Sequence, residues 1–88
     1  MQRVSVEMSL YPLTPDYIPV IEDFIARLRA NRNLTVVTNT MSTQVQGDYD
    51  EVFDTLKHEM RPNLSGSHKA VFAVKFLGPV STGLQYTP

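Results

Sequence analysis

The sequence contains no cysteine and no tryptophan, and only four glycines among its 88 residues. The lack of cysteine excludes disulfides, thiolate nucleophiles, iron–sulfur clusters and cysteine-ligated zinc, and it is typical of a protein from a reducing compartment. The glycines form no Gly-x-Gly-x-x-Gly or Gly-x-x-x-x-Gly-Lys loop that would hold phosphates, so nucleotide-dependent catalysis is not indicated. A Gly-x-Ser-x-Gly motif is also missing, and we therefore expect no hydrolase triad.

Long hydrophobic runs and an excess of charge of one sign are missing too. No segment approaches the roughly 18 uninterrupted apolar residues of a membrane span, and the first residues lack the basic and apolar regions of a secretory signal. Eight basic against nine acidic residues give a formal net charge of −1, which does not favour nucleic acid as a partner. With 42% hydrophobic and 19% charged residues, the composition is that of a soluble globular domain, which we expect in the cytoplasm.

Four segments have the patterns of β-strands. Apolar and polar residues alternate over residues 3–11, as in a strand with one buried face, and Pro12 is expected to end it. The β-branched residues of 34–38 and the following residues 42–46 predict a hairpin with a turn between them. Residues 69–77 are a strongly apolar run and predict the last strand.

Two further segments have the apolar spacing of amphipathic helices. The first helix is predicted over about 15–30, with Thr14 as the N-cap and Pro15 as the first helical residue. The second helix is predicted over about 48–61, and Pro62 is expected to stop it because proline has no backbone N–H.

The entry to the second helix has its own signals. Gly47 is expected to give the backbone more conformational freedom there. Asp48 is followed three residues later by Glu51, which predicts a capping box. The sequence therefore predicts a sharp passage from strand to helix at residue 48.

The order strand, helix, strand, strand, helix, strand predicts an α+β fold of the ferredoxin-like βαββαβ type. Right-handed crossovers place both helices on one face of a four-stranded antiparallel sheet, with strand order 4-1-3-2. Residues 1–79 then form a single domain, and residues 80–88 a polar C-terminal tail.

The last strand is apolar on both faces apart from Lys75, although this fold places it at the edge of the sheet. Either the C-terminal tail folds back over it or a second subunit packs against it. We favour the second subunit, because such an edge invites association. The sequence therefore predicts a homodimer or a higher homo-oligomer.

Residues for catalysis are few. His58 and His68 share no metal-binding spacing, and the strand at 42–46 has no aromatic ring on which an RNA base would stack. We expect no catalytic residue, no metal and no cofactor. One enzymatic alternative stays open, a small acid/base enzyme that uses Glu7 with His68.

Two stretches, Val6 to Leu13 and Thr38 to Val52, are similar to the YkoF-type family of thiamine/hydroxymethylpyrimidine-binding proteins. The resemblance spans roughly residues 3–77 and implies a ferredoxin-like fold that binds thiamine or its pyrimidine half without catalysis. Some members carry two copies of the domain in one chain. The resemblance therefore implies that any two-copy arrangement is rebuilt here by association of chains.

An aminopyrimidine has ring nitrogens and an exocyclic amine, so its site needs hydrogen-bond acceptors, donors and an apolar or aromatic wall. Glu7 would accept a hydrogen bond from the amine or face the cationic thiazolium of thiamine. Tyr11, Met41 or Tyr49 would supply the wall. The predicted ligand-binding residues are Glu7, Ser9, Tyr11, Asn39, Met41, Ser42, Thr43 and Gln44.

Several of these residues also have purely structural interpretations. Glu7 would pair with an arginine across a subunit interface, Asn39 would only form the turn, and Tyr49 would only begin the second helix. An alternative function is a regulatory module that senses another small effector at a subunit interface, as ferredoxin-like amino-acid-sensing domains do.

Overall fold

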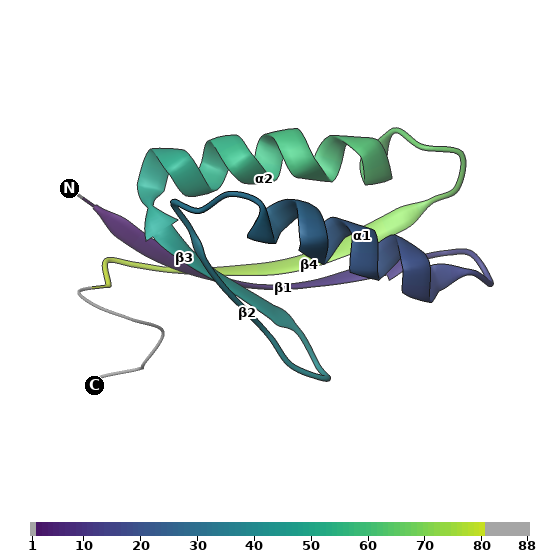
Figure 1. Cartoon of the computed structure of the whole chain (residues 1–88), viewed down its shortest axis with the longest axis horizontal. Coiled ribbons are helices and arrows are strands. Elements are labelled where there is room, and N and C mark those ends of the chain that lie inside the picture. Colours follow the sequence, from purple (N-terminus) through teal and green to yellow (C-terminus); the bar gives the residue numbers. More distant parts are fainter. Residues whose placement is uncertain (1, 81–88) are drawn as a thin grey trace.

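The computed structural model describes residues 2–80, which form a ferredoxin-like βαββαβ fold. The elements are β1 (Arg3–Pro12), α1 (Tyr17–Arg29), β2 (Thr35–Thr38), β3 (Thr43–Asp48), α2 (Tyr49–Leu64) and β4 (Ala70–Leu77). The antiparallel sheet has the order β2-β3-β1-β4, and both helices cover the same face (Figure 1). The predicted fold class and strand order are confirmed. The predicted tail, residues 80–88, lies outside the described residues except for Val80.

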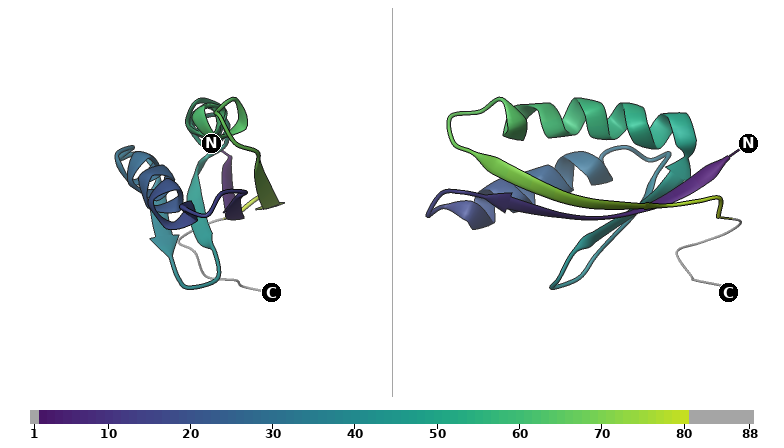
Figure 2. Two further views of the ribbon diagram at one scale, coloured as in Figure 1. Left: turned by 90° about the vertical axis from the view of Figure 1, so that its right-hand side faces the viewer. Right: turned by 180° about the vertical axis from the view of Figure 1, so that it is seen from behind.

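The alternation in β1 separates the two faces of the sheet. Val6, Met8 and Leu10 are buried in the core under the helices, together with Phe24 and Leu28 of α1. Because successive strand residues point to opposite faces, the odd-numbered residues of β1 lie on the face without helices, called here the open face. The end-on view shows both helices on one side of the sheet (Figure 2).

Helix α1 begins at Tyr17, two residues later than predicted, and its N-cap is Asp16 rather than Thr14. Pro19 explains the difference. In a helix beginning at Pro15, the N–H of residue 19 would bond to the carbonyl of residue 15, and proline has no N–H to donate. Beginning at Tyr17 places Pro19 in the first turn, where the backbone N–H groups have no intrahelical partner.

Helix α2 continues to Leu64, so the prediction that Pro62 stops it is wrong. Pro62 lies in the last turn of α2, where it removes the one helical hydrogen bond to the carbonyl oxygen of His58 without ending the helix. Beyond it, the N–H and Oγ of Ser65 both donate to the carbonyl oxygen of Arg61, at 3.0 and 2.6 Å, and close the helix end. Neither helix of residues 2–80 is long and apolar enough to cross a membrane.

Asp48 is the N-cap of α2, as predicted, but the capping box is wrong. The carboxylate of Glu51 accepts hydrogen bonds from the side-chain amides of Asn31, at 2.8 Å, and Asn33, at 3.4 Å. Glu51 therefore fixes the loop after α1 to α2 instead of capping its own helix.

Gly47 lies within β3, which continues to Asp48, so the strand ends two residues later than the predicted residue 46. A Cβ atom at Gly47 would lie 2.6 Å from the Cδ2 atom of Leu34 and 3.4 Å from Cγ2 of Val52. The glycine is therefore explained by the close approach of these two core side chains.

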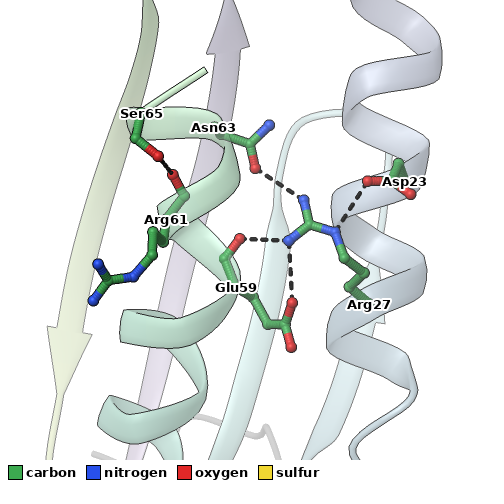
Figure 3. A network of polar contacts seen from close by, with 6 residues as sticks. All are labelled: Asp23, Arg27, Glu59, Arg61, Asn63 and Ser65. Atoms are coloured by element: carbon green, nitrogen blue, oxygen red, sulfur yellow. Dashed lines mark hydrogen bonds and ion pairs between the residues drawn. The ribbon is translucent and has the colours of Figure 1, made fainter.

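The side chain of Arg27 joins the two helices (Figure 3). Its Nη1 donates to the carbonyl oxygen and to Oε1 of Glu59, at 2.6 and 3.1 Å, and its Nη2 donates to Oδ1 of Asn63 at 3.0 Å. Its Nε donates to Asp23 on its own helix, at 3.0 Å. Only 24% of the Arg27 side chain is exposed, so this charge is partly buried and matched by four acceptors.

Candidate functional site

The two halves of β1 have different neighbours. β3 pairs with β1 only as far as Met8, which lies opposite Thr43, whereas β1 continues to Pro12 along β4. The β2–β3 hairpin therefore leaves β1 after Met8, and Figure 1 shows it projecting away from the line of β1 and β4. This divergence leaves one edge of residues 9–12 without a neighbouring strand, next to α1.

A cavity of about 470 Å³ occupies this divergence. Its apolar lining comes from β1, the loop after it and α1: Met8, Leu10, Pro12, Leu13, Tyr17, Ile21, Phe24 and Ile25. Its other lining residues are Ser9 and Tyr11 of β1 and residues 39–43 of the hairpin. A volume of this size is typical of sites for small organic molecules.

The backbone of Leu10 faces this cavity edge. The N–H of Leu13 donates to the carbonyl oxygen of Lys69, so odd-numbered residues of β1 point their backbone groups at β4. Since this direction alternates along an antiparallel strand, Leu10 points its N–H and C=O away from β4, where β3 no longer pairs with β1. Leu10 thus offers an adjacent backbone donor and acceptor at the cavity.

Six of the eight predicted ligand-binding residues line the cavity: Ser9, Tyr11, Asn39, Met41, Ser42 and Thr43. Glu7 and Gln44 do not line it. They lie opposite each other in the pairing of β1 with β3, and Glu7 lies on the open face. Tyr49, the third candidate for the aromatic wall, packs against Phe53 instead, with ring centroids 4.7 Å apart.

Side-chain hydrogen bonds hold the hairpin end of the cavity. Oδ1 of Asn39 accepts from the N–H groups of Met41 and Ser42, at 2.8 and 3.0 Å. The hydroxyl of Ser9 donates to the carbonyl oxygen of Met41 at 3.3 Å, which connects the hairpin to β1. Asn39 therefore forms the turn, as its structural interpretation required, and also lines the cavity.

Glu7 contacts the cavity only through Ser42. Its Oε2 accepts a hydrogen bond from Oγ of Ser42 at 3.2 Å, and its Oε1 lies 3.7 Å from Nζ of Lys75. Lys75 is almost fully exposed, so this ion pair contributes little to stability. Glu7 therefore positions a hydroxyl of the lining, and its charge has a counter-charge on β4.

The residues that sequence reasoning missed are the apolar ones, Leu10 and Tyr17 among them. Their spacing in β1 and α1 predicts core packing, and Leu10 is indeed also a buried core residue. No sequence signal separates a core residue that lines a cavity from one that does not. The difference arises where β3 ends, which periodicity alone does not define.

The histidines lie elsewhere. His68 lines a separate cavity with Arg27 and Pro62, and His58 lines a shallow groove between the helices. The cavity at His68 does not include Glu7, so the two residues of the acid/base alternative do not share a cavity. Within residues 2–80, no cluster of three or more histidine, aspartate or glutamate residues is arranged to hold a metal ion.

Comparison with known proteins identifies the family. The sequence matches the YKOF-related family over residues 3–76, which is most of the chain. The chain belongs to the YKOF-related family. Among curated proteins, no relative matches this YKOF-related sequence.

Solved structures with the same fold include three relevant neighbours of this YKOF-related chain. A hypothetical protein from Methanocaldococcus jannascii is 24% identical, with a TM-score of 0.78 over 97% of this chain and 89% of its own. A protein from Streptococcus pneumoniae is 25% identical, with a TM-score of 0.73 over 86% of each chain. A putative thiamine biosynthesis/salvage protein from Thermotoga maritima is 17% identical, with a TM-score of 0.67 over 84% of this chain and 81% of its own.

Proposed function

We propose that this YKOF-related protein binds thiamine or its hydroxymethylpyrimidine moiety in the cavity between β1, α1 and the β2–β3 hairpin. The observation that carries the proposal is the lining of this cavity, which combines a broad apolar wall with a few polar groups at one end. A flat, mostly apolar ring with polar edges needs this combination.

The polar groups of the cavity include the hydrogen-bond donors and acceptors that an aminopyrimidine needs, and they lie at one end of the cavity. The backbone N–H of Leu10 would donate to a ring nitrogen, and its C=O would accept from the exocyclic amine. The hydroxyls of Ser9 and Ser42 lie at the same end and would bind the hydroxymethyl group or a bridging water. Tyr17 and Phe24 of α1 would cover the faces of the ring.

Binding without chemical change is part of the proposal. The described lining residues include no carboxylate, imidazole, ammonium or guanidinium group, and two tyrosines are the titratable side chains among them. General acid–base catalysis most often uses one of these missing groups. We therefore place the protein in transport or salvage of the vitamin, with the cytoplasm as its expected location.

The family supports this choice of ligand. The Thermotoga maritima neighbour is described as a putative thiamine biosynthesis/salvage protein, and it has the same fold at 17% identity. An identity this low transfers the fold and not the ligand, so the lining of the cavity is the main support.

We also propose that two or more copies of the chain associate. Val71 and Leu77 of β4 are half exposed on the open face, and Phe76 is half exposed on the helix-covered face. Apolar side chains gathered on one edge strand are typical of a surface that another protein covers.

Thermal melts test the ligand. A ligand that binds only the native state adds about 2.7 kcal/mol at a hundredfold excess over its Kd, and a domain of this size gains about 4 to 8 °C per kcal/mol. We expect millimolar thiamine or hydroxymethylpyrimidine to raise the Tm and to be recovered unchanged. A melt that responds to neither compound contradicts the proposal, and one that responds to amino acids favours the regulatory alternative.

A pair of variants tests the position of the site. Tyr17 and Ile18 are adjacent at the start of α1 and similarly exposed, at 50% and 55%, but only Tyr17 lines the cavity. We expect Tyr17→Ala to weaken binding about fivefold to tenfold, since an aromatic contact contributes roughly 1 kcal/mol. The matched control Ile18→Ala should leave affinity unchanged in calorimetry. Equal effects of both variants would contradict this placement.

A further inference from the structure

Two serine hydroxyls of the cavity already donate their protons within the protein. Oγ of Ser9 donates to the carbonyl oxygen of Met41 at 3.3 Å. Oγ of Ser42 donates to Oε2 of Glu7 at 3.2 Å. A carbonyl oxygen and an ionised carboxylate accept hydrogen bonds and cannot donate them, so the direction of both bonds is fixed. Each hydroxyl has one proton, and what each oxygen can still offer a ligand is therefore an acceptor.

The two hydroxyls lie at one corner of the cavity. Both serines line it, and Ser9 bonds to the residue that directly precedes Ser42 in the hairpin. Glu7 and Ser9 are two residues apart in β1, so their side chains lie on the same face of the sheet. We call Ser9 and Ser42, with the Glu7 carboxylate behind Ser42, the serine corner.

The serine corner has a negative charge behind it. Oε2 of Glu7 contacts Ser42, whereas Oε1 lies 3.7 Å from Nζ of Lys75. Lys75 belongs to β4, which pairs with β1 on the side away from the hairpin. The carboxylate therefore lies between the ammonium group and Ser42, and the negative charge is the nearer of the two to the cavity.

No cationic side chain offsets this charge inside the cavity. Among residues 2–80, the lining includes no lysine, arginine or histidine. Residues 81–88, outside the described part of the chain, contain none in their sequence. The donors of the lining, such as the side-chain amide of Asn39, are uncharged. An anion at the serine corner would thus meet two acceptor oxygens and a carboxylate without a compensating positive charge.

We propose that Glu7 determines specificity at this site, by making the serine corner bind the hydroxyl group of a neutral alcohol and exclude the phosphate ester of the same alcohol. The inference rests on the proposed binding of hydroxymethylpyrimidine and deepens it by naming the chemical form of the ligand. A hydroxymethyl group has a proton to donate to Ser9 or Ser42. A phosphate monoester instead carries about 1.5 to 2 negative charges at pH 7 and presents acceptor oxygens.

Glu7 acts on the ligand through Ser42 and is a positioning residue, because its own side chain does not line the cavity. It has two separable effects. Its oxygen accepts the proton of Ser42, which leaves that hydroxyl as an acceptor, and its charge opposes a nearby anion. Glu7→Gln keeps an acceptor oxygen and removes the charge, whereas Glu7→Ala removes both.

A competing position for an anion is the start of α1. Tyr17 lines the cavity and is the first residue of this helix, whose unpaired backbone N–H groups carry partial positive charge. Asp16, directly before it, places a negative charge at the same helix end. Pro19 removes one of the N–H groups of the first turn. The start of α1 is therefore poorly suited to a phosphate, and binding there is one outcome of the test.

Calorimetry with hydroxymethylpyrimidine and its phosphate ester tests the selectivity. We expect the alcohol to bind and the ester to bind at least about tenfold more weakly, because like charges at close range oppose association. Binding of neither compound would overturn the proposed function, and this inference with it. Binding of the alcohol with a smaller difference, or tighter binding of the ester, would overturn this inference alone and favour the start of α1 as a phosphate site.

Variants of Glu7 test its part in the selectivity. Its side chain is 47% exposed, so substitution leaves the core intact. The ratio of the two Kd values should fall in Glu7→Gln, which loses the charge, and fall further in Glu7→Ala, where the Ser42 hydroxyl is free to donate to the ester. A purely structural role would change both Kd values alike and leave their ratio as it is in the wild type.

Lys75→Ala is the matched control, because it removes the other half of the same ion pair. It should bind the alcohol as the wild type does and should not lower the ratio, since Lys75 does not line the cavity. An unchanged ratio in both Glu7 variants, or an equal fall in Lys75→Ala, would contradict the assignment of specificity to Glu7.

Discussion

At the scale of single residues, Arg27 connects the two helices. Its guanidinium reaches from α1 to a backbone carbonyl, a carboxylate and a side-chain amide on α2, and it also lies 5.6 Å from the ring centroid of Phe24. Planar guanidinium groups suit such multiple acceptors, and a lysine would satisfy fewer of them. The cost of losing Arg27 includes the acceptors on Glu59 and Asn63 that would lose their partner.

The first stability prediction concerns this residue. Arg27→Ala should lower the free energy of unfolding by about 2 kcal/mol, because hydrogen bonds to a charged, partly buried group are each stronger than the average. The Tm should then fall by roughly 8 °C or more. Arg29→Ala, at an exposed position in the same helix, is the control and should change stability by less than about 0.5 kcal/mol. Equal urea midpoints for the two variants would show that the helix contact does not depend on Arg27.

At the scale of the elements, Asn39 has two roles in the β2–β3 hairpin, and one substitution tests both. Its Oδ1 holds the turn between β2 and β3, and the same turn forms one end of the cavity. Asn39→Ala should destabilise the fold by about 1 kcal/mol and weaken ligand binding, because residues 41 and 42 lose the acceptor that fixes them.

Asn39→Asp keeps an acceptor oxygen in the same place and should retain most of the stability. Thr40→Ala, one residue along the turn, is the matched control in the denaturation series. If the alanine and aspartate variants lost stability equally, the turn would not depend on the Asn39 oxygen.

At the same scale, the limits of sequence reasoning lie in where elements end. Alternation in β1 correctly separated Val6, Met8 and Leu10 from the open face, because period-2 burial is a local property. The cavity, in contrast, exists because β3 stops pairing at Met8 while β4 accompanies β1 to Pro12. The difference between the lengths of these two strand pairings depends on residues far apart in the chain, so no local sequence pattern predicts it.

For this reason the predicted site was displaced toward the open face. Polar residues are the main signal of a site in the sequence, and six of the eight predicted ligand-binding residues line the cavity, but Glu7, the predicted acceptor, does not. The apolar wall from α1 could not be predicted from the sequence, because a helix residue that faces a cavity has the same spacing as one that faces the core. The helix ends deviated for a related reason, since Pro19 and Pro62 matter only through their positions within a turn.

At the scale of the whole molecule, the proposed ligand site and the proposed surface of association lie on different parts of the fold. The cavity lies where β1 diverges from the hairpin, whereas the free edge of β4 lies on the opposite side of β1. No residue of β4 lines the cavity. Each process should therefore stabilise the fold by its own free energy, without requiring the other.

Protein concentration separates the two contributions. If native chains pair and unfolded chains do not, a tenfold rise in concentration favours the native dimer by about 1.4 kcal/mol, which corresponds to about 3 to 6 °C in Tm for a unit of this size. Wild-type melts should show this dependence from micromolar concentrations upward. Leu77→Lys should abolish it while keeping the full shift caused by thiamine, because Leu77 lies opposite Ser5 and neither residue lines the cavity. Loss of the ligand shift together with the concentration dependence would mean that the cavity is formed only in the dimer, and the independence of the two surfaces would then be wrong.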